Sequence, residues 1–354
     1  MLPFIAQQLI DWHGRFGRHN LPWQDTRDPY AIWLSEIMLQ QTQVTTVIPY
    51  YTRFLREFPT VRSLAEAPLD AVLALWSGLG YYSRARNLHL AARQIMQHRR
   101  GQFPSTRTEI EQLPGIGRST AAAIAVFAFG KREAILDGNV KRVFARYFGI
   151  DGFLGETKTV SLLWKKAEAA LPADCRPGNI ETYTQALMDL GATVCTRNSP
   201  RCHVCPLQQQ CIAYRNRCVD QLPVPKQRKP LPQKETVMLL LLLQQQKLLL
   251  QKRASKGIWG ALWCPPEIET GVDPVRYCRN NLGLTVQPPV ELPVLNHQFT
   301  HFKLRIYPQL LHVISDTVEP HPQFTWINPV DALEQGIPAP VRKLLKQTFA
   351  KHHG

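Results

Sequence analysis

The first 230 residues read as a succession of helices. Apolar residues recur there at three- and four-residue spacing, and no strand-like alternation interrupts them. Phe4, Ile5, Leu9, Trp12 and Phe16 follow this spacing and predict one amphipathic helix within the first 20 residues. Prolines and glycines separate the further predicted helices, which we place at 31–47, 50–57, 63–67, 69–79, 83–98, 141–148, 158–171 and 180–194.

The pattern changes after residue 235. Four stretches have the composition of strands and two that of helices: 237–243, 247–251, 304–313 and 324–327, and then 274–282 and 341–351. The basic, proline-rich stretch 221–235 comes before them and reads as an extended linker. The chain is therefore predicted to have a mostly α N-terminal region and a separate C-terminal domain of mixed α and β structure.

The helical region is organised around residues 113–143. Gly115 and Gly117 form a turn before a helix of small residues, and glycine lets the backbone approach a partner without a Cβ clash. The free amides of the helix N-terminus favour a phosphate. A loop then brings Asp137 to the start of another helix. The alternative is a helix hairpin that has no ligand.

The composition of the chain indicates what class of partner it binds. The 354 residues carry a net charge of +15, and the basic residues are spread along the whole chain. This favours nucleic acid as partner, whereas a charge that serves only solubility is the alternative. The longest apolar run, 237–243, is too short to cross a bilayer, and no signal peptide is recognisable. We expect a soluble, intracellular protein.

Four cysteines form a ligand pattern. Cys195, Cys202, Cys205 and Cys211 have six, two and five residues between them. Four thiolates in one short loop can hold a [4Fe–4S] cluster, and a zinc ion is the alternative. The other four cysteines lack such spacing and read as ordinary buried thiols: Cys175, Cys218, Cys264 and Cys278.

The LPGIG turn, the Asp137 loop and the cysteine spacing together resemble the helix-hairpin-helix DNA glycosylases of the endonuclease III superfamily, and among them the MutY-type adenine DNA glycosylases. The resemblance implies two helical lobes with DNA bound across the cleft. A six-helix barrel would cover about 21–130, a cluster lobe 1–20 plus 131–220, and a Nudix-like domain 236–354. It implies one [4Fe–4S] cluster and a monomer in the bacterial cytoplasm, used at the nucleoid and away from membranes.

The same resemblance implies a reaction. The enzyme would be a monofunctional glycosylase that acts on adenine mispaired with 8-oxoguanine or guanine in duplex DNA. Glycosylase–lyases of this superfamily carry a lysine nucleophile where this chain has Ser119, and a hydroxyl cannot form a Schiff base. An endonuclease III-like glycosylase–lyase for oxidised pyrimidines and a non-catalytic DNA-binding protein are the alternatives.

Two carboxyl groups suit this chemistry. The adenine must be protonated, and the cationic sugar must be stabilised. Glu36, in LSEIMLQQTQV, matches the family's catalytic acid, and its apolar neighbours predict a raised pKa. Asp137, beside a helix start, is expected to stay ionised and to face the sugar. Asn139 either holds the carboxylate or the reacting water, or caps the helix.

The resemblance assigns further residues to DNA. Gln41 and Tyr81 match the residues that fill the gap left by the flipped base, and Gly115, Gly117 and Ser119 belong to the DNA-binding hairpin. Four more residues are implied to line the adenine pocket: Leu21, Trp23, Gln24 and Gln185.

The C-terminal domain resembles Nudix domains but lacks their magnesium-binding glutamates. Their positions are occupied by Tyr277, Asn280 and Asn281. We therefore expect no catalytic divalent site and regard nucleotide hydrolysis as the least favoured activity. In the family a Phe-Ser-His turn contacts 8-oxoguanine, and this chain has Phe299, Thr300 and His301. Thr300 keeps the hydroxyl and adds a methyl group. A simple turn at a strand end is the alternative.

Overall fold

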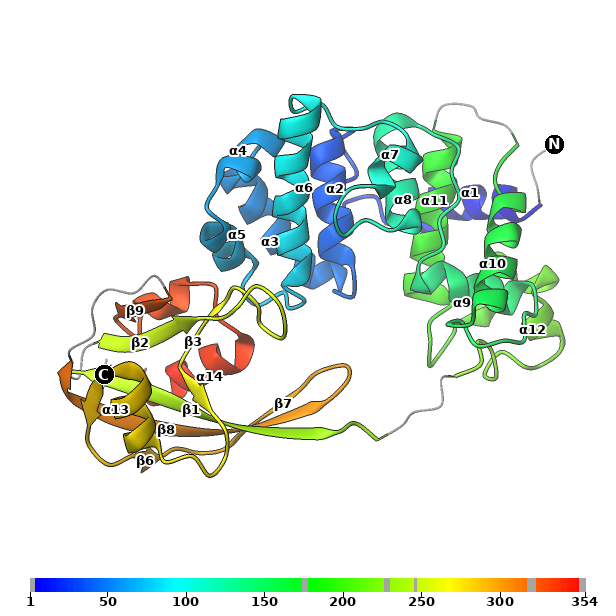
Figure 1. Ribbon diagram of the computed structural model, residues 1–354. Helices are drawn as coiled ribbons and strands as arrows, with labels where there is room; N and C mark the ends of the chain where they lie inside the picture. Colours follow the sequence, from blue (N-terminus) through cyan, green and yellow to red (C-terminus); the bar gives the residue numbers. More distant parts are fainter. Residues whose placement is uncertain (1–3, 174–177, 226–229, 245–246, 317–322, 350–354) are drawn as a thin grey trace. The chain divides into compact units, whose positions relative to one another are not determined.

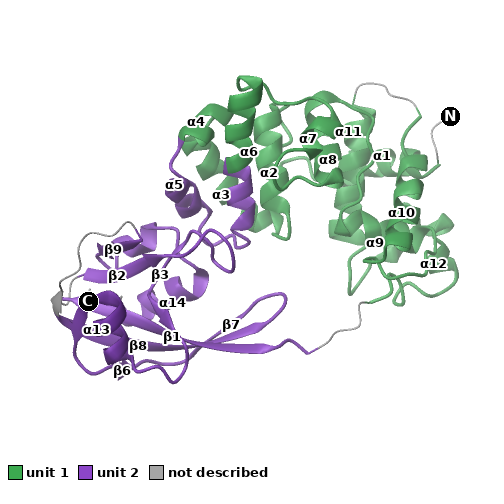
Figure 2. Cartoon of the chain, in the orientation of Figure 1, with its two compact units in different colours: residues 1–66, 90–228 green, residues 67–89, 229–354 purple. Residues whose placement is uncertain are grey.

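The computed structural model describes residues 4–173, 178–225, 230–244, 247–316 and 323–349 (Figure 1). The chain divides into two compact units, one formed by Met1–Glu66 and Leu90–Arg228 and the other by Ala67–His89 and Lys229–Gly354 (Figure 2). Cys175, residues 226–229 of the expected linker and the end of the helix predicted at 341–351 lie outside the described residues.

The first unit is helical, as the apolar spacing predicts. Its helices are α1 (Phe4–Phe16), α2 (Pro29–Leu39), α3 (Val44–Glu57), α4 (Val61–Glu66), α7 (Arg107–Glu111), α8 (Arg118–Phe129), α9 (Gly138–Tyr147), α10 (Thr157–Ala169), α11 (Asn179–Asp189) and α12 (Ile212–Arg215). A π-helical turn, Leu190–Val194, continues α11, and two short 3-10 turns follow at Cys202–Val204 and Gln208–Gln210. The helix α6 (Ser83–Arg99) begins in the second unit and ends in the first.

Two sequence predictions in this unit are wrong. The single helix expected at 31–47 is divided into α2 and α3, and between them Gln41 adopts a left-handed φ of 58°. A left-handed residue cannot continue a right-handed helix. Pro49, expected to break the chain into separate helices, lies inside α3. Because Val47, Tyr51 and Phe54 form one buried face across it, packing outweighs the proline's cost of about 3 kcal/mol.

A shared core joins the N-terminal helix to helices that follow the hairpin. Ile5, Leu9 and Trp12 of α1 pack in one buried cluster with residues such as Phe144 of α9 and Tyr183 of α11. α1 and α11 are direct neighbours (Figure 1). This core therefore supports the chain segments that carry Asp137 and the cysteines.

The second unit is built on one mixed sheet. Its strands are β1 (Gln233–Leu243), β2 (Lys247–Lys252), β3 (Trp263–Cys264), β4 (Glu267–Ile268), β5 (Leu284–Val286), β6 (Val290–Glu291), β7 (Leu295–Gln298), β8 (Lys303–Asp316) and β9 (Phe324–Ile327). β1 and β8 are parallel from Gln233↔Lys303 to Leu243↔Val313, and the other pairs are antiparallel. Its helices are α5 (Leu69–Trp76), α13 (Pro274–Leu282) and α14 (Ala339–Phe349), with a 3-10 turn at Asp331–Glu334.

The centre of this sheet explains the longest apolar run. Every residue from 237 to 242 is buried, as expected for a strand covered on both faces. Val237, Leu239 and Leu241 pack with Cys278 of α13 on one face.

None of the described helices combines the length and apolarity needed to cross a lipid bilayer. The fold class predicted from the sequence, a mostly α region with an iron–sulfur-type cysteine loop followed by an α+β domain, is confirmed in its helical and strand content.

Candidate active site

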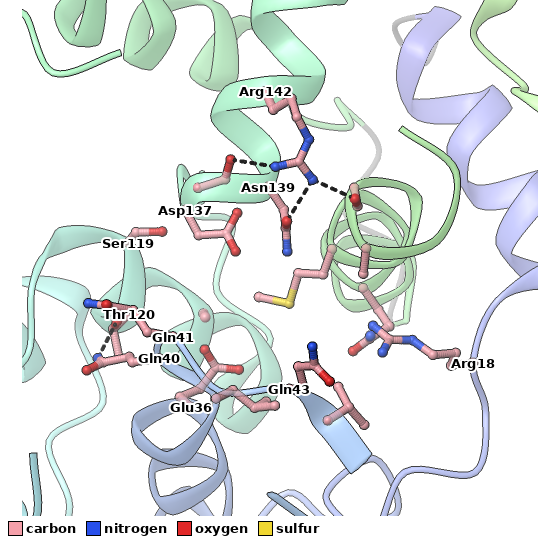
Figure 3. A pocket seen from close by; sticks show the side chains of 18 of the residues that line it. Arg18, Glu36, Gln40, Gln41, Gln43, Ser119, Thr120, Asp137, Asn139 and Arg142 are labelled. Atoms are coloured by element: carbon pink, nitrogen blue, oxygen red, sulfur yellow. Dashed lines mark hydrogen bonds between the residues drawn. The ribbon is translucent and has the colours of Figure 1, made fainter. Parts of the chain in front are cut away.

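A large cleft opens in the first unit. Its volume is about 1960 Å³, beyond the roughly 300–1,000 Å³ of ordinary small-molecule pockets, so a nucleotide and its backbone could enter it. Figure 3 shows the side chains that face it. Ten of the predicted site residues line it: Leu21, Trp23, Gln24, Glu36, Gln41, Gly117, Ser119, Asp137, Asn139 and Gln185.

Glu36 faces this cleft from α2. The helix starts at Asp28, whose side chain accepts a hydrogen bond from the Tyr30 amide and caps the helix. Trp33, Ile37 and Met38 beside Glu36 are buried. Burial, and then the nearby Asp137 charge, raises the pKa of Glu36 to about 8. The side chain is thus protonated near neutral pH while it remains accessible from the cleft.

Asp137 faces the same cleft from the start of α9. Its Oδ1 accepts a hydrogen bond of 2.7 Å from the Val140 amide, which makes Asp137 the N-cap of the helix. Burial raises the pKa of Asp137, whereas hydrogen bonds from the Val140 and Asn139 amides and the charge of Arg142 act in the opposite direction. The pKa of Asp137 is raised overall, and the pKa of Glu36 is raised to about 8, so the pair retains a proton near neutral pH.

Ser119 supports the Asp137 loop. Its Oγ accepts a hydrogen bond of 2.9 Å from the Leu136 amide, directly before Asp137. The next residue, Thr120, accepts a hydrogen bond of 3.3 Å from Gln40 Nε2 at the end of α2. The start of α8 is thus tied both to the helix that carries Glu36 and to the loop that carries Asp137.

Asn139 is held by an arginine that the sequence analysis missed. Arg142 Nη2 donates to Asn139 Oδ1 at 2.9 Å and to the Gly191 carbonyl at 2.7 Å, and its Nε donates to the Cys195 carbonyl at 2.8 Å. The amide nitrogen of Asn139 points away from Arg142 (Figure 3). The N-cap role considered for Asn139 belongs to Asp137. The only sequence signal for Arg142 is its position three residues after Asn139 on one helix face.

A buried ion pair lies beside the residues predicted to line an adenine pocket. Asp189, only 1% exposed, accepts hydrogen bonds from the Arg18 amide at 2.7 Å and from its guanidinium at 2.6 and 2.8 Å. Gln185 Nε2 also donates to Asp189, at 2.9 Å. Gln24 joins its Oε1 to the Leu21 amide and its Nε2 to the Arg18 carbonyl. No spacing in the sequence relates Arg18 to Asp189, because only the fold brings them together.

The two predicted gap-filling residues share a backbone feature. Gln41 has a φ of 58° and Tyr81 a φ of 48°, a conformation that non-glycine residues seldom adopt. Such strain concentrates at functional positions. Gln41 lines the cleft of the first unit, whereas Tyr81 belongs to the second unit and has an exposed ring.

The two glycines of the hairpin differ in whether their backbone conformation requires glycine. Gly115 has a φ of 79° and therefore needs to be glycine, while Gly117, the N-cap of α8, has an extended φ of −97°. A Cβ at Gly117 would meet no atom within 4 Å. Gly117 lines the cleft, and Gly115 is not among the cleft-lining residues.

The four predicted ligand cysteines line one cavity. Residues of α9 and of the cysteine loop complete its wall, among them Val143, Arg146 and Leu207. Backbone amides donate to sulfur: that of Leu207 to Cys205, and those of Ala213 and Tyr214 to Cys211. Arg146 Nη1 lies 3.4 Å from Cys195 Sγ.

These donors suit thiolates. Amide and guanidinium hydrogen bonds compensate the negative charge of sulfurs that bind a metal centre. The donors around these sulfurs therefore fit an anionic metal centre held by thiolates.

The predicted base-reading turn joins β7 to β8. Phe299 stacks on Phe302 with ring centroids 4.5 Å apart and lies 5.4 Å from Trp259. Thr300 Oγ1 lies 3.4 Å from His301 Nδ1, and both side chains are exposed. The aromatic packing presents the polar tip of the turn to solvent.

The Nudix-like helix α13 has no acid in its sequence PVRYCRNNL. Asn280 and Asn281 are exposed, and Tyr277 is half-buried. Divalent ions in such sites are bound by carboxylates, so this helix offers no ligand set for one.

Comparisons with known proteins agree with this geometry. Residues 34–169 match the HhH-GPD superfamily of base excision DNA repair proteins, and residues 237–347 match the NUDIX domain. The chain is 38% identical over 350 residues to the adenine DNA glycosylase of Buchnera aphidicola subsp. Baizongia pistaciae, which covers 98% of both chains. Its identity to the human adenine DNA glycosylase is 44% over 214 residues, which is 58% of this chain and 38% of the human one.

A solved structure extends the comparison to the fold. A thermostable thymine-DNA glycosylase is 30% identical, covers 60% of this chain and 95% of its own, and superposes with a TM-score of 0.54. The full-length match to a bacterial relative, the two domain matches and the paired carboxyl groups lead to one conclusion. The chain belongs to the adenine DNA glycosylase family, the monofunctional enzymes of base excision repair that hydrolyse the N-glycosidic bond of adenine.

Proposed function

We propose that this enzyme removes adenine opposite 8-oxoguanine or guanine in duplex DNA, and that Glu36 and Asp137 perform the hydrolysis. The observation that carries the proposal is the carboxyl pair in one cleft, in which burial and the Asp137 charge raise the pKa of Glu36 to about 8. A shared proton gives the two groups different tasks, as acid and as anion.

In the proposed reaction, the Glu36 carboxyl donates its proton to a ring nitrogen of adenine as the bond to the sugar breaks. The bonding electron pair leaves with the base, and positive charge develops on the sugar. The Asp137 carboxylate stabilises that cation, by about 4 kcal/mol for a contact pair in a partly wet site, or roughly a thousandfold in rate. Water then adds to the sugar carbon and returns a proton to the Glu36 carboxylate. The amide of Asn139, oriented by Arg142, holds the carboxylate or this water.

The adenine must leave the helix before this chemistry can start. The size of the cleft supports entry of a flipped nucleotide. We propose that Leu21, Trp23, Gln24 and Gln185 surround the base and that Gln41 and Tyr81 fill the vacated space. The strained backbone of Gln41 and Tyr81 supports this role. The hairpin with Gly115, Gly117 and Ser119 would bind the phosphate backbone.

The second unit would read the opposite base. The exposed hydroxyl of Thr300 and ring of His301 are hydrogen-bonding groups on a turn braced by Phe299. The lack of carboxylates on α13 supports binding without nucleotide hydrolysis.

We place the enzyme in the bacterial cytoplasm, acting at the nucleoid as a monomer. We also propose the boundaries 1–220, 221–235 and 236–354 for the glycosylase region, linker and Nudix-like domain.

We further propose one [4Fe–4S] cluster on Cys195, Cys202, Cys205 and Cys211. When bound, it would tie the cysteine loop to the helical core and would supply no step of base release. Amide donors to Cys205 and Cys211 and the guanidinium at Cys195 support an anionic centre here. Visible absorption of the purified protein distinguishes iron–sulfur from colourless zinc.

The function is tested with a panel of duplexes that place adenine opposite 8-oxoguanine, guanine, thymine or cytosine. Free base and strand breaks are both measured. We expect adenine release from the first two duplexes, with no strand scission before the abasic site is cleaved chemically. Equal release from all four duplexes would refute the proposed mispair preference.

The acid is tested with Glu36→Gln. This variant should lose base release while it retains duplex binding, because the amide cannot donate an acidic proton. Glu57→Gln, an exposed glutamate at the end of α3, is the matched control and should retain full activity. Adenine release at the parent rate by Glu36→Gln would show that another group is the acid.

A further inference from the structure

Tyr81 lies in a segment that is packed into the base-reading unit. Residues 67–89 belong to the same compact unit as the Nudix-like domain, although residues 90–228 separate them from it in the sequence (Figure 2). Two hydroxyls donate to the carbonyl of Ile337: Tyr82 Oη at 3.0 Å and Ser77 Oγ at 3.2 Å. Arg342 of α14 donates through Nη2 to Ser77 Oγ at 2.8 Å. The loop that carries Tyr81 is thus bonded on both sides to residues 337–342.

Close packing extends this contact along α5. A Cβ at Gly336 would lie 3.0 Å from Leu73 Cβ, so a side chain there would require the two segments to move apart by a few tenths of an ångström. Lys252 of β2 donates to Asp70 at 2.7 Å, and Arg86 of α6 donates to the Gly260 carbonyl at 2.8 Å. Ser77, Tyr82 and Ile337 are all buried, so these hydrogen bonds are shielded from water.

The Tyr81 loop is itself stiff. Trp76 Nε1 donates to the Gly80 carbonyl at 3.2 Å, and Arg84 Nη2 donates to the Leu79 and Gly80 carbonyls at 3.2 Å each. The Arg84 guanidinium also lies over the Tyr81 ring, 5.6 Å from its centroid. In a loop braced in this way, a displacement at Ser77 or Tyr82 is transmitted to the backbone of Tyr81.

We propose that Arg342, through Ser77 and the Ile337 carbonyl, is a positioning residue for Tyr81, so that the unit that reads the opposite base also sets the residue that fills the gap in the helix. This inference rests on the proposed function of Tyr81 and of the Thr300 turn. Arg342 is half-buried, and its guanidinium is directed at Ser77, so it acts through that hydroxyl and not as a phosphate ligand. Recognition of 8-oxoguanine and insertion of Tyr81 then depend on one rigid contact.

The test compares Arg342→Ala with Lys346→Ala, a neutralised exposed cation on the same helix. Single-turnover rates are measured on full-length protein for adenine opposite 8-oxoguanine and opposite guanine. We expect Arg342→Ala to lower the preference for 8-oxoguanine by about tenfold, the size of one hydrogen bond to a charged group. Lys346→Ala should leave the preference unchanged, and Arg342→Lys should restore part of it by keeping a donor near Ser77.

A double-mutant cycle separates positioning from general destabilisation. In a Tyr81→Ala background, Arg342→Ala should have no further effect on the preference, because the group it positions is missing. Additive losses would overturn the inference. If Arg342→Ala does not fold, Tyr82→Phe replaces it, since it removes one hydrogen bond to Ile337 and keeps the buried ring. An unchanged preference in Tyr81→Ala alone would instead show that the proposed role of Tyr81 is wrong.

Discussion

At the residue scale, the chemistry depends on the environment of two carboxyl groups. Burial disfavours the charged form of Glu36, and its helix neighbours Trp33, Ile37 and Met38 are buried as well. Asp137 receives a backbone hydrogen bond at a helix start, which favours its anion and partly offsets the burial that raises its pKa. In the proposed mechanism, the same functional group therefore serves as acid at one position and as anion at the other.

The first prediction concerns pH. Because the protonated form of Glu36 is the acid, base release should be constant below its pKa and should fall tenfold per pH unit well above about 8. Single-turnover rates between about pH 6 and 10 measure this profile. A rate that stays flat through the alkaline range would exclude Glu36 as the proton donor.

The second prediction concerns stability. The pKa of Glu36 is raised from 4.5 to about 8 in the folded state, so the fold binds a proton that the unfolded chain has lost between these values. Retaining this proton lowers the free energy of unfolding, and the loss grows as the pH rises through this window. Glu36→Gln should therefore raise the free energy of unfolding at pH 7 by on the order of 2–3 kcal/mol and have little effect at about pH 4.

Urea unfolding at the two pH values tests this expectation, and Glu57→Gln is again the control. A catalytic acid that destabilises its own fold is a common compromise between activity and stability. Equal stability of Glu36→Gln and the parent protein at both pH values would contradict the raised pKa.

At the element scale, the hairpin between α7 and α8 and the break between α2 and α3 position the site. Both depend on left-handed residues, Gly115 in the first and Gln41 in the second. Glycine in a turn can be predicted from the sequence, since it is the residue that such a turn prefers. Gln41 could not, because its conformation is imposed by the packing around it and its local sequence favours a continuous helix.

The third prediction compares two glycines of the hairpin. Gly115→Ala forces an alanine into the left-handed region at a cost of about 1–2 kcal/mol, and so it should weaken duplex binding about equally for all sequences. Gly117→Ala is the comparison, because its φ suits alanine and its Cβ would meet no neighbour within the protein; it should not strain the hairpin and should lose less binding than Gly115→Ala. Fluorescence anisotropy with matched and mismatched duplexes measures both. Equal losses for the two variants would mean that the backbone conformation of Gly115 is not the cause.

At the scale of the whole molecule, the chain combines a helical unit that contains the cleft with a strand-rich unit that contains the Thr300 turn.

The fourth prediction concerns the Thr300 turn. Thr300→Ala removes the hydroxyl and should lower the preference for 8-oxoguanine over guanine by about tenfold, whereas Thr300→Ser should retain it. Asn296→Ala, an exposed change on β7, is the control. If Thr300→Ala retained the full preference, the hydroxyl would have no part in reading the base.

Much of this architecture followed from the sequence alone. The strongly periodic segments, such as 274–282, form the helices that the spacing predicts, and the apolar run at 237–243 forms the centre of a strand. The sequence also determined which chemistry is missing. A hydroxyl at Ser119 and amides at Asn280 and Asn281 cannot become an amine or carboxylates in any fold.

Tertiary structure alone decided which distant residues act together. Segments with no common sequence pattern are joined by the Arg18–Asp189 ion pair, by the bonds from Arg142 to the Gly191 and Cys195 carbonyls, and by the inclusion of residues 67–89 in the second unit. The apolar neighbours of Glu36 predict the direction of its pKa shift, whereas its size depends on the fold, because desolvation and the Asp137 charge act fully only when separate helices enclose the carboxyl. A local sequence specifies side-chain chemistry and backbone preference, whereas burial and proximity are created by packing of the whole chain.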